Sequence, residues 1–321
     1  MKPVTVACAG CGSFAGLIAW LSRTTGAVRI VSCFDPDSSR AAAFARRHRV
    51  PVVTGSYEEL LESGAEAAYL PAPHVYHVSY ARAALAKGLH VLVEKPLAFT
   101  LAEAEELVSL ADQRGRVLAV NFHNRFHRGS KRLIARSASG QMGRPVMTTA
   151  AVPWARPAEY APAAGWRAQV KLSGGGTLMT QAIHALDVAL RAQHSPPVSV
   201  ATHLAHMKFA ENETEDTAAC QVQMADGSVL QLLSTMAAAR ERPATIEVFA
   251  RNGHARTAIA HGAAFLTASR RSLNAFAHAI RTQTEPAHSA RSCLAITAVV
   301  EAAYHAGRSG TIVHLRRDGE L

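Results

Sequence analysis

The sequence predicts an α/β protein of two domains, the first built on a parallel sheet and the second on a large, mainly antiparallel open sheet. The chain has 321 residues, more than a single hydrophobic core usually serves. Short β-branched runs alternate with amphipathic stretches from Val4 to Val120, and strands of alternating polarity prevail after Gly143. The first pattern is typical of βαβ units and the second of antiparallel sheets. We place the domains at residues 1–121 and 122–321.

The first half contains five strand-like runs, which are VTVACA (4–9), VRIVSCF (28–34), AAYLPA (67–72), HVLVEK (90–95) and RVLAVN (116–121). Amphipathic segments predict helices at 14–23, 38–47, 57–62, 75–87 and 101–114. The alternation of the two kinds of segment predicts a parallel sheet flanked by helices.

The second half contains six longer runs of alternating polarity, at 146–152, 198–209, 217–224, 228–236, 244–250 and 254–260. Asp226-Gly227 and Asn252-Gly253 separate neighbouring runs, and such pairs favour tight hairpins. Helices are expected at 177–191, 269–282 and 291–305.

Composition argues against nucleic-acid and membrane partners. The formal charge is +10, but the arginines are dispersed and no recognition motif carries them. No apolar run approaches the roughly twenty residues that cross a bilayer. The five cysteines are an odd, scattered set, which fits reduced thiols better than a disulfide framework. We therefore expect a cytoplasmic protein.

A glycine-rich loop follows the first strand and opens a helix. It reads G-x-G-x-x-A and consists of Gly10, Cys11, Gly12, Ser13, Phe14 and Ala15. The glycines permit a tight turn and close approach of a pyrophosphate, and the alanine permits close packing of helix on strand. Asp35 ends the second strand, where its carboxylate would accept hydrogen bonds from ribose hydroxyls. These features predict a Rossmann dinucleotide-binding domain that uses NAD, and Arg40 beside Asp35 leaves NADP possible.

Two spacings raise the alternative of a metal or redox site. Cys8 and Cys11 form C-x-x-C, but no second such pair exists, and these residues fall in the first strand and the glycine loop. His123 and His127 have the i, i+4 spacing of zinc ligands without the glutamate of H-E-x-x-H. We predict no metal.

Three further motifs carry a resemblance to a known family. Glu94-Lys95-Pro96 stands at the end of the strand-like run at 90–95, PAPHVYH occupies 71–77, and GGGTLMTQAIHALD occupies 174–187. Together with the glycine loop they resemble the Gfo/Idh/MocA family of sugar and polyol oxidoreductases, over essentially the whole chain. The resemblance implies a sugar-like substrate and a homodimer or homotetramer formed through the open sheet.

The resemblance also implies roles for individual residues. Lys95 and His184 correspond to the family's catalytic pair. Cofactor contacts are implied, beyond the glycine loop and Asp35, for Pro71, Ala72, His74, His77, Glu94 and Lys95. Substrate contacts are implied for Lys95, Asn121, His123, Arg125, Trp166, Arg167, Thr180 and His184. The chemistry is consistent, because oxidation of an alcohol needs a group that takes its proton and a cation that stabilises the developing charge on oxygen.

One position departs from the family pattern. Many members carry an aspartate four residues before the histidine, and this chain has Thr180 there. A hydroxyl supplies no charge, so we interpret Thr180 as a substrate or histidine contact. Asp187, three residues after His184, is a candidate for supporting the histidine.

Two other functions fit the same residues. Some relatives use NAD transiently in a non-redox reaction that eliminates a substituent from a sugar, and the fold also serves as a ligand-sensing regulator. Net change of the cofactor distinguishes the first alternative, and absence of turnover distinguishes the second.

Overall fold

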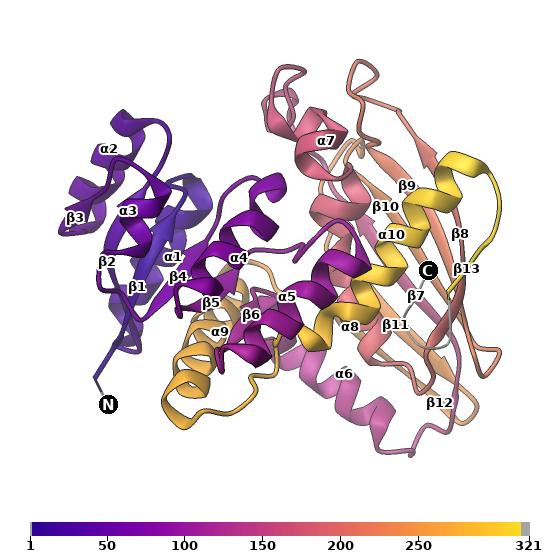
Figure 1. Ribbon diagram of the computed structural model, residues 1–321. Helices are drawn as coiled ribbons and strands as arrows, with labels where there is room; N and C mark the ends of the chain where they lie inside the picture. Colours follow the sequence, from indigo (N-terminus) through magenta and orange to yellow (C-terminus); the bar gives the residue numbers. More distant parts are fainter. Residues whose placement is uncertain (1, 316–321) are drawn as a thin grey trace. The chain divides into compact units, whose positions relative to one another are not determined.

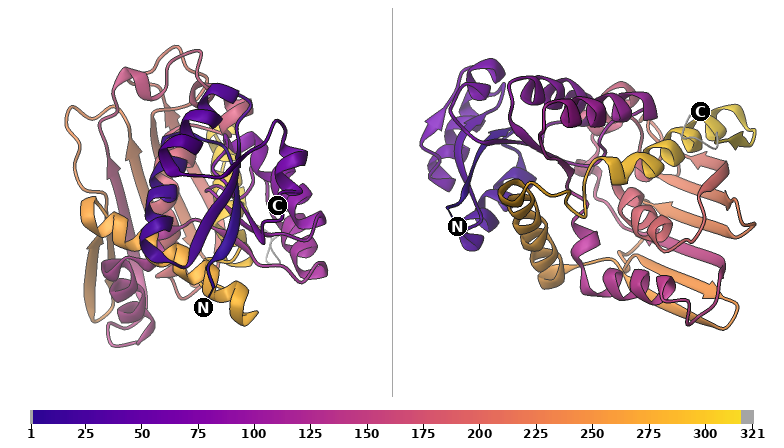
Figure 2. Two further views of the ribbon diagram at one scale, coloured as in Figure 1. Left: turned by 90° about the vertical axis from the view of Figure 1, so that its left-hand side faces the viewer. Right: turned by 60° about the horizontal axis from the view of Figure 1, so that its bottom comes forward.

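The computed structural model describes residues 2–315 and divides the chain into two compact units (Figures 1 and 2). The first unit contains the residues up to Ala98, Glu103–His123 and Phe265–Ser292. The second contains Phe99–Ala102, Asn124–Ala264 and the residues from Cys293 onward.

The first unit is built on a six-stranded parallel sheet with the order β3-β2-β1-β4-β5-β6. Its strands are β1 (Val4–Ala9), β2 (Val28–Phe34), β3 (Val52–Val53), β4 (Ala67–Leu70), β5 (His90–Val93) and β6 (Leu118–Val120). The connecting helices are α1 (Ser13–Thr25), α2 (Ser38–His48), α3 (Tyr57–Leu61), η1 (His74–Tyr76), α4 (His77–Ala86) and α5 (Leu101–Gln113). This strand order is that of a dinucleotide-binding sheet, which confirms the predicted fold class. The two-residue β3 is exposed and gave no strand pattern in the sequence.

Helix α9 (Gly262–Thr282) packs with the first unit, although the predicted boundary placed everything after residue 121 in the second. Its apolar side chains Leu273, Phe276 and Ile280 belong to the buried core that also contains strands β1 and β2. The sequence of α9 does not indicate which domain the helix joins, because a helix that covers a sheet is amphipathic whichever sheet it covers.

An ion pair ties α9 to the first unit and should make stability depend on acid pH. Arg281 donates to Glu66 Oε2 at 3.1 Å, and this bond lowers the pKa of Glu66 to about 2. The pKa of Glu66 in the unfolded chain is about 4.3. The contribution of the ion pair to the free energy of unfolding is therefore complete above that pH and is lost as the pH falls towards 2. We expect Glu66→Gln to lower the free energy of unfolding by about 0.5–1 kcal/mol at neutral pH, because the pair is partly exposed. Urea titrations at pH 7 and pH 3 should show this difference shrinking in acid; a difference independent of pH would contradict it.

The second unit is built on a seven-stranded sheet with the order β12-β11-β7-β10-β9-β8-β13. Its strands are β7 (Pro145–Pro153), β8 (Pro197–Ala205), β9 (Thr217–Met224), β10 (Val229–Thr235), β11 (Thr245–Ala250), β12 (Gly253–Ala258) and β13 (Val313–His314). All neighbours are antiparallel except β7 and β10, so the prediction of a mainly antiparallel sheet is confirmed. Along β9, buried and exposed side chains alternate, as in a sheet with one solvated face.

Helices cover one face of this sheet (Figure 2). The helical segments of the second unit are α6 (Arg128–Ala138), η3 (Ala158–Tyr160), η4 (Trp166–Ala168), α7 (Val170–Ser173), η5 (Leu178–Ala182), α8 (Ile183–Arg191) and α10 (Leu294–Ser309). The short η2 (His123–Phe126) and η6 (Arg291–Cys293) lie where the chain passes from one unit to the other. The predicted helix at 177–191 opens with η5, a π-helical turn that runs into α8. Such turns are rare in proteins, and those that occur are often found at functional sites.

Candidate active site

The glycine loop adopts the conformation that its sequence predicts. Gly10 has φ +111°, and a Cβ there would lie 3.1 Å from the backbone of Pro71 and Ala72. Gly12 caps α1 without a side-chain hydrogen bond, and no atom lies within 4 Å of the place where its Cβ would be. The loop therefore presents the unfilled amino end of a helix, which suits a phosphate group.

Asp35 is tied directly to this loop. Its Oδ2 accepts a hydrogen bond from Cys11 N at 2.9 Å, and its Oδ1 accepts one from Asp37 N at 3.0 Å. Arg40 lies 3.3 Å from the same carboxylate. The residue is 7% exposed, and each carboxylate oxygen keeps lone-pair capacity for a ribose hydroxyl. The structure thus brings together the predicted loop and its acidic partner.

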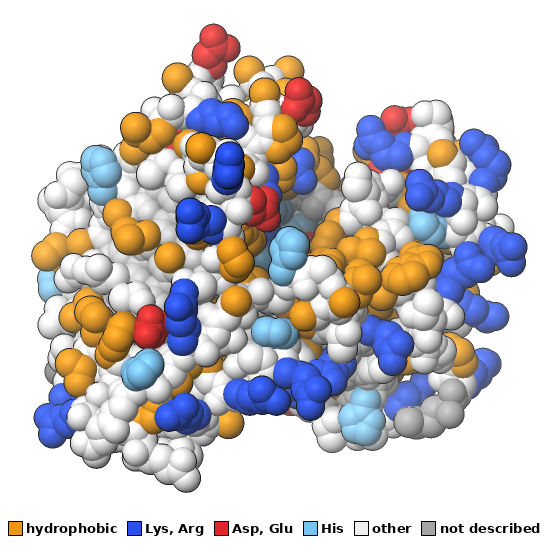
Figure 3. All heavy atoms as spheres, turned by 180° about the vertical axis from the view of Figure 1, so that it is seen from behind, with side chains coloured by type: hydrophobic (Ala, Val, Ile, Leu, Met, Phe, Trp, Pro, Cys, Tyr) orange, Lys and Arg blue, Asp and Glu red, His pale blue; other side chains and the backbone are white. Residues whose placement is uncertain are grey.

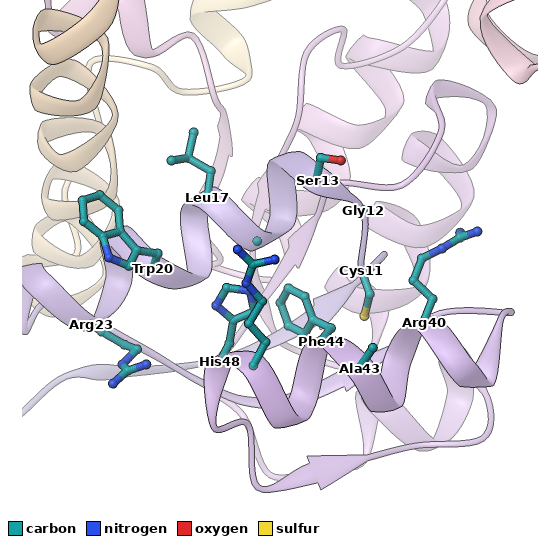
Figure 4. Close-up of a pocket in the computed structure, with 12 residues that line it drawn as sticks. Cys11, Gly12, Ser13, Leu17, Trp20, Arg23, Arg40, Ala43, Phe44 and His48 are labelled. Carbon is teal, nitrogen blue, oxygen red and sulfur yellow. The ribbon is translucent and has the colours of Figure 1, made fainter. Parts of the chain in front are cut away.

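A groove of about 750 Å³ continues from the loop between α1 and α2 (Figure 4). Arg23, Arg40 and Arg47 line it, together with Trp20 and Phe44, and no acidic side chain does. In the space-filling view, arginine and lysine side chains border apolar ones in the region of these helices (Figure 3). This side of the loop is therefore cationic.

Cys11, Phe14 and Ala15 of the loop pack inward, whereas Ser13 is exposed. Ala15 is fully buried, and Phe14 meets Phe265 of α9 edge to face, with ring centroids 6.3 Å apart. Cys8 and Cys11 donate to backbone carbonyls of Gly10 and Phe34, and all five cysteines are free, buried thiols.

The segment after β4 is held by a buried histidine. The ring nitrogens of His77 lie 2.6 Å from Pro96 O and 3.0 Å from Ala72 O, so His77 links the two loops that follow β4 and β5. Burial lowers the pKa of His77 to about 4, against the opposing effect of the two carbonyls. His77 is thus a structural tie; His74 is also buried, with its ring centroid 5.4 Å from that of His77.

Lys95 follows β5 at the carboxyl edge of the parallel sheet, directly after Glu94. Glu94 Oε1 accepts hydrogen bonds from Tyr69 OH at 2.8 Å and from Asn121 Nδ2 at 2.7 Å. Ser272 Oγ donates to Asn121 Oδ1 at 2.9 Å. Asn121, expected to touch substrate, is therefore fully buried in a network that fixes the residue beside Lys95.

His123 is buried close to this network. Burial lowers the pKa of His123 to about 3, and the positive charge of Lys95 contributes to the shift. Its ring meets Phe265 edge to face at 4.8 Å. A histidine that stays neutral beside an ammonium keeps the surroundings of Lys95 from gaining a second positive charge.

In the second unit, steric constraints explain the triple glycine. A Cβ on Gly174 would lie 2.5 Å from the Phe99 ring, and one on Gly175 would lie 2.1 Å from Tyr304. A Cβ on Gly176 would lie 1.7 Å from the backbone oxygen of Glu215. No side chain fits at these positions.

Glu215 anchors the start of the helical segment that carries His184. Its carboxylate accepts hydrogen bonds from Gly176 N at 2.8 Å, Leu178 N at 2.9 Å and Tyr304 OH at 2.9 Å. Glu215 and Tyr304 gave no signal in the sequence, because neither lies in a motif and only the fold brings them to the glycines. Burial raises the pKa of Glu215, and the hydrogen bonds favour its charged form.

Thr180 and Asp187 have partners of their own in the second unit. Thr180 Oγ1 donates to Gly176 O at 2.7 Å. Asp187 forms a buried ion pair with Arg125, whose Nε lies 2.8 Å from Oδ2, and Arg125 also lies 3.3 Å from Cys293 Sγ. Arg125 was expected to contact substrate; it is 4% exposed and neutralises Asp187. Asp187 is therefore engaged by an arginine rather than available for the role of the aspartate that Thr180 replaces.

Within residues 2–315, no cluster of three His, Cys, Asp or Glu side chains has the arrangement of a metal site, and no helix is long and apolar enough to span a bilayer.

Comparison with known families identifies both halves. A model described as "Oxidoreductase family, NAD-binding Rossmann fold" matches residues 4–122, and one described as "GFO/IDH/MocA C-terminal domain" matches residues 127–256. The chain belongs to the Gfo/Idh/MocA family. The cofactor of its first domain is accordingly NAD, in agreement with the glycine loop and Asp35.

Individual members of the Gfo/Idh/MocA family are related at modest identity. The chain is 29% identical over 212 residues to 1,5-anhydro-D-fructose reductase from Ensifer adhaerens, covering 65% of this chain and 62% of the relative. It is 31% identical over 207 residues to D-glucoside 3-dehydrogenase from Escherichia coli, covering 63% and 58%. The match thus spans less than two thirds of either relative.

The fold of the whole chain matches solved structures of the family. The WlbA dehydrogenase from Bordetella pertussis, crystallised with NADH and UDP-GlcNAcA, superposes with a TM-score of 0.88 at 24% identity, over 98% of this chain and 99% of that one.

Proposed function

We propose that this chain is an NAD-dependent oxidoreductase that acts on a hydroxyl or carbonyl group of a sugar, polyol or related derivative. The observation that carries the proposal is the open glycine loop bonded to Asp35, within a Rossmann sheet of the Gfo/Idh/MocA family. The related enzymes named above are reductases and dehydrogenases of sugar derivatives, which supports the same class of reaction.

Residues of the first unit would hold the cofactor. Backbone amides at Cys11, Gly12 and Ser13 would face the pyrophosphate, and Asp35 would bind the ribose. Bound NAD supplies the acceptor or donor of hydride. The open space at Gly12 and the uncapped end of α1 fit a phosphate of this cofactor.

In this proposal Lys95 and His184 handle the proton of the reacting oxygen. The ammonium of Lys95 stabilises negative charge as the hydroxyl loses its proton, and the imidazole of His184 exchanges that proton. The hydrogen bonds of Glu94 and Asn121 hold the backbone beside Lys95, and the bonds of Glu215 hold the segment that leads to His184. Thr180 replaces a charged neighbour of the histidine, so the basicity of His184 would depend on the substrate and on solvent.

We also infer a homodimer or homotetramer formed through the open sheet of the second unit. The solvated face of that sheet exposes Val146, Met147, Leu233 and Phe249, each at least 36% exposed. Light scattering should report a mass of two or four chains, and Leu233→Lys should shift it towards the monomer. A monomer at micromolar concentration would contradict this inference. We further propose that the protein works in the cytoplasm.

Replacing Asp35 should change the preference for the cofactor. Asp35→Ala removes the ribose acceptor, so the Kd for NAD should rise roughly ten- to a hundredfold, the loss expected for a charged hydrogen bond. The Kd for NADP should rise less, because the carboxylate no longer repels a 2′-phosphate. Equilibrium dialysis with both dinucleotides measures the two effects.

Asp112→Ala is the matched control, since Asp112 is an exposed carboxylate of the same unit, paired with Arg291. If the Kd values of NAD and NADP rose equally in Asp35→Ala, Asp35 would only stabilise the structure of the loop and would not bind the ribose.

A panel of sugars, polyols, sugar acids and amino sugars tests the reaction itself. With NAD and NADP in parallel, at least one compound should give net change in the absorbance of reduced nicotinamide. Release of a leaving group without such a change would indicate the non-redox reaction, and NAD binding without any turnover would indicate a regulator.

A further inference from the structure

A group of side chains in the second unit combines arginines with aromatic rings beside the helical segment of His184. We define the arginine–aromatic cluster as Trp154, Arg156, Tyr160, Trp166 and Arg167. Arg156 Cζ lies 4.7 Å from the Trp154 ring centroid and 5.5 Å from that of Tyr160. Arg167 Cζ lies 4.8 Å from the Tyr160 centroid and 4.5 Å from that of Trp166. Both guanidinium groups therefore contact the same tyrosine.

The cluster is joined to the segment that precedes His184. Gln181 lies in the π-helical turn, directly after Thr180, and is 7% exposed. Its amide donates to Tyr160 OH, and its Oε1 accepts a hydrogen bond from Arg156 at 3.2 Å. Both partners of Gln181 belong to the cluster. The guanidinium groups therefore lie next to the helical segment that carries His184, which our proposed function assigns to the reaction of the substrate.

The two arginines differ in their counter-charges. Arg156 is paired with Glu241 at 2.7 Å. Arg167 is partly buried, and no ion pair within residues 2–315 includes it. Of the nearby acids, Glu213 accepts a hydrogen bond from Val170 N at 2.9 Å, and Glu159 is exposed.

A further cation lies beside Arg156. Lys208 Nζ donates to the backbone oxygen of Arg156 at 2.6 Å. The carboxylate of Asp216 accepts a hydrogen bond from the backbone nitrogen of Lys208 at 2.7 Å. Among the described residues, the only ion pair that includes Arg156, Arg167 or Lys208 is that of Arg156 with Glu241. A planar guanidinium held between aromatic faces presents its fork of donors in a fixed orientation, which matches a carboxylate or a phosphate.

We infer that the substrate carries an anionic group, a carboxylate or a phosphate, and that Arg167 binds it. This inference rests on the proposed function, because it assigns the substrate class of the same enzyme. Arg167 supplies a charge that no ion pair among the described residues matches. The rings of Tyr160 and Trp166 fix the direction of its donors, and Gln181 with Arg156 holds Tyr160 in place.

Calorimetry on the NAD-loaded protein tests this inference with matched sets of compounds. The sets are D-glucose, D-glucuronate and D-glucose 6-phosphate, and their galactose counterparts. At least one anionic member should bind tenfold or more tightly than its neutral counterpart, and the carboxylate and phosphate arms identify which anion is preferred. Arg167→Ala should weaken the binding of that anionic compound roughly ten- to a hundredfold, the loss expected for a charge-assisted hydrogen bond. The binding of the neutral sugar should stay nearly unchanged.

Two further variants separate charge from geometry. Arg308→Ala removes an exposed arginine at the end of α10 and should leave the anion preference intact. Arg167→Lys keeps the charge without the fork and should retain part of the preference. The inference is overturned if no anionic member binds more tightly than its neutral counterpart, including a lack of binding by all, or if the preference survives in Arg167→Ala.

Hydride transfer is recorded separately with the same compounds. Anion-selective binding without reduced nicotinamide would contradict the oxidoreductase proposal and leave the assignment of Arg167 standing. Equal turnover of neutral and anionic members would support the oxidoreductase proposal and contradict the assignment of Arg167 to an anionic group.

Discussion

Lys95→Ala should lower kcat by at least about a hundredfold, the low end for a positioned acid/base group. The change removes the ammonium at the carboxyl edge of the parallel sheet, where its charge would stabilise the oxygen that loses a proton. Side chains around it are arranged to keep that charge in place, since Glu94 is fixed by Tyr69 and Asn121. The effect should appear in kcat more than in the thermal midpoint, because Lys95 lies outside the buried core.

Lys87→Ala provides the control for this variant. Lys87 is an exposed lysine of the first unit, paired with Glu62 at 3.0 Å, and its loss should leave turnover within a factor of about two, as for a surface pair. Steady-state rates with a substrate found in the panel measure both variants. Turnover of Lys95→Ala within a few-fold of the parent chain would remove Lys95 from the mechanism.

Gly176→Ala should destabilise the second unit by more than about 3 kcal/mol or prevent it from folding, as expected when a side chain is forced against fixed backbone. The added Cβ would lie 1.7 Å from Glu215 O, and it would also disturb the bond from Gly176 N to the Glu215 carboxylate. Since this contact is with backbone, no rotation of a side chain relieves it. The segment leading to His184 would be displaced with it.

Gly140→Ala separates this contact from the general cost of replacing glycine. Gly140 has φ +74°, and no atom lies within 4 Å of its Cβ position, so its cost should be about 1–2 kcal/mol of left-handed strain. Urea denaturation of both variants, or the yield of folded protein where Gly176→Ala does not fold, measures the contrast. Equal stability of the two variants would contradict the close packing at Gly176.

The first domain was predictable because its signals are local. The glycine loop, Asp35 and the strand ending in Lys95 each lie within a few residues of the element they belong to, and the predicted parallel sheet is the one observed. Helix α9 shows the limit of such signals. Its amphipathic pattern predicts a helix, but only the buried packing of Phe276 and Ile280 shows which sheet it covers.

The environment of each candidate residue was less accessible from sequence than its identity. Asn121 and Arg125 were expected to contact substrate, yet the structure places the first among Glu94 and Ser272 and the second against Asp187. Their polar side chains read alike in a sequence whether they meet a ligand or a buried partner. Glu215 gave no signal at all, because its hydrogen bonds reach across residues far apart in the chain.

The central claim is that the glycine loop holds NAD so that a sugar-like substrate exchanges hydride under the control of Lys95 and His184. The most direct measurement is the absorbance of reduced nicotinamide, followed with the purified chain, NAD and the sugar and polyol panel, in parallel with Lys95→Ala and His184→Ala. We predict net formation of reduced cofactor with at least one compound and its near loss in both variants. Binding of NAD with no net change of cofactor across the panel, or undiminished rates in both variants, would contradict the claim.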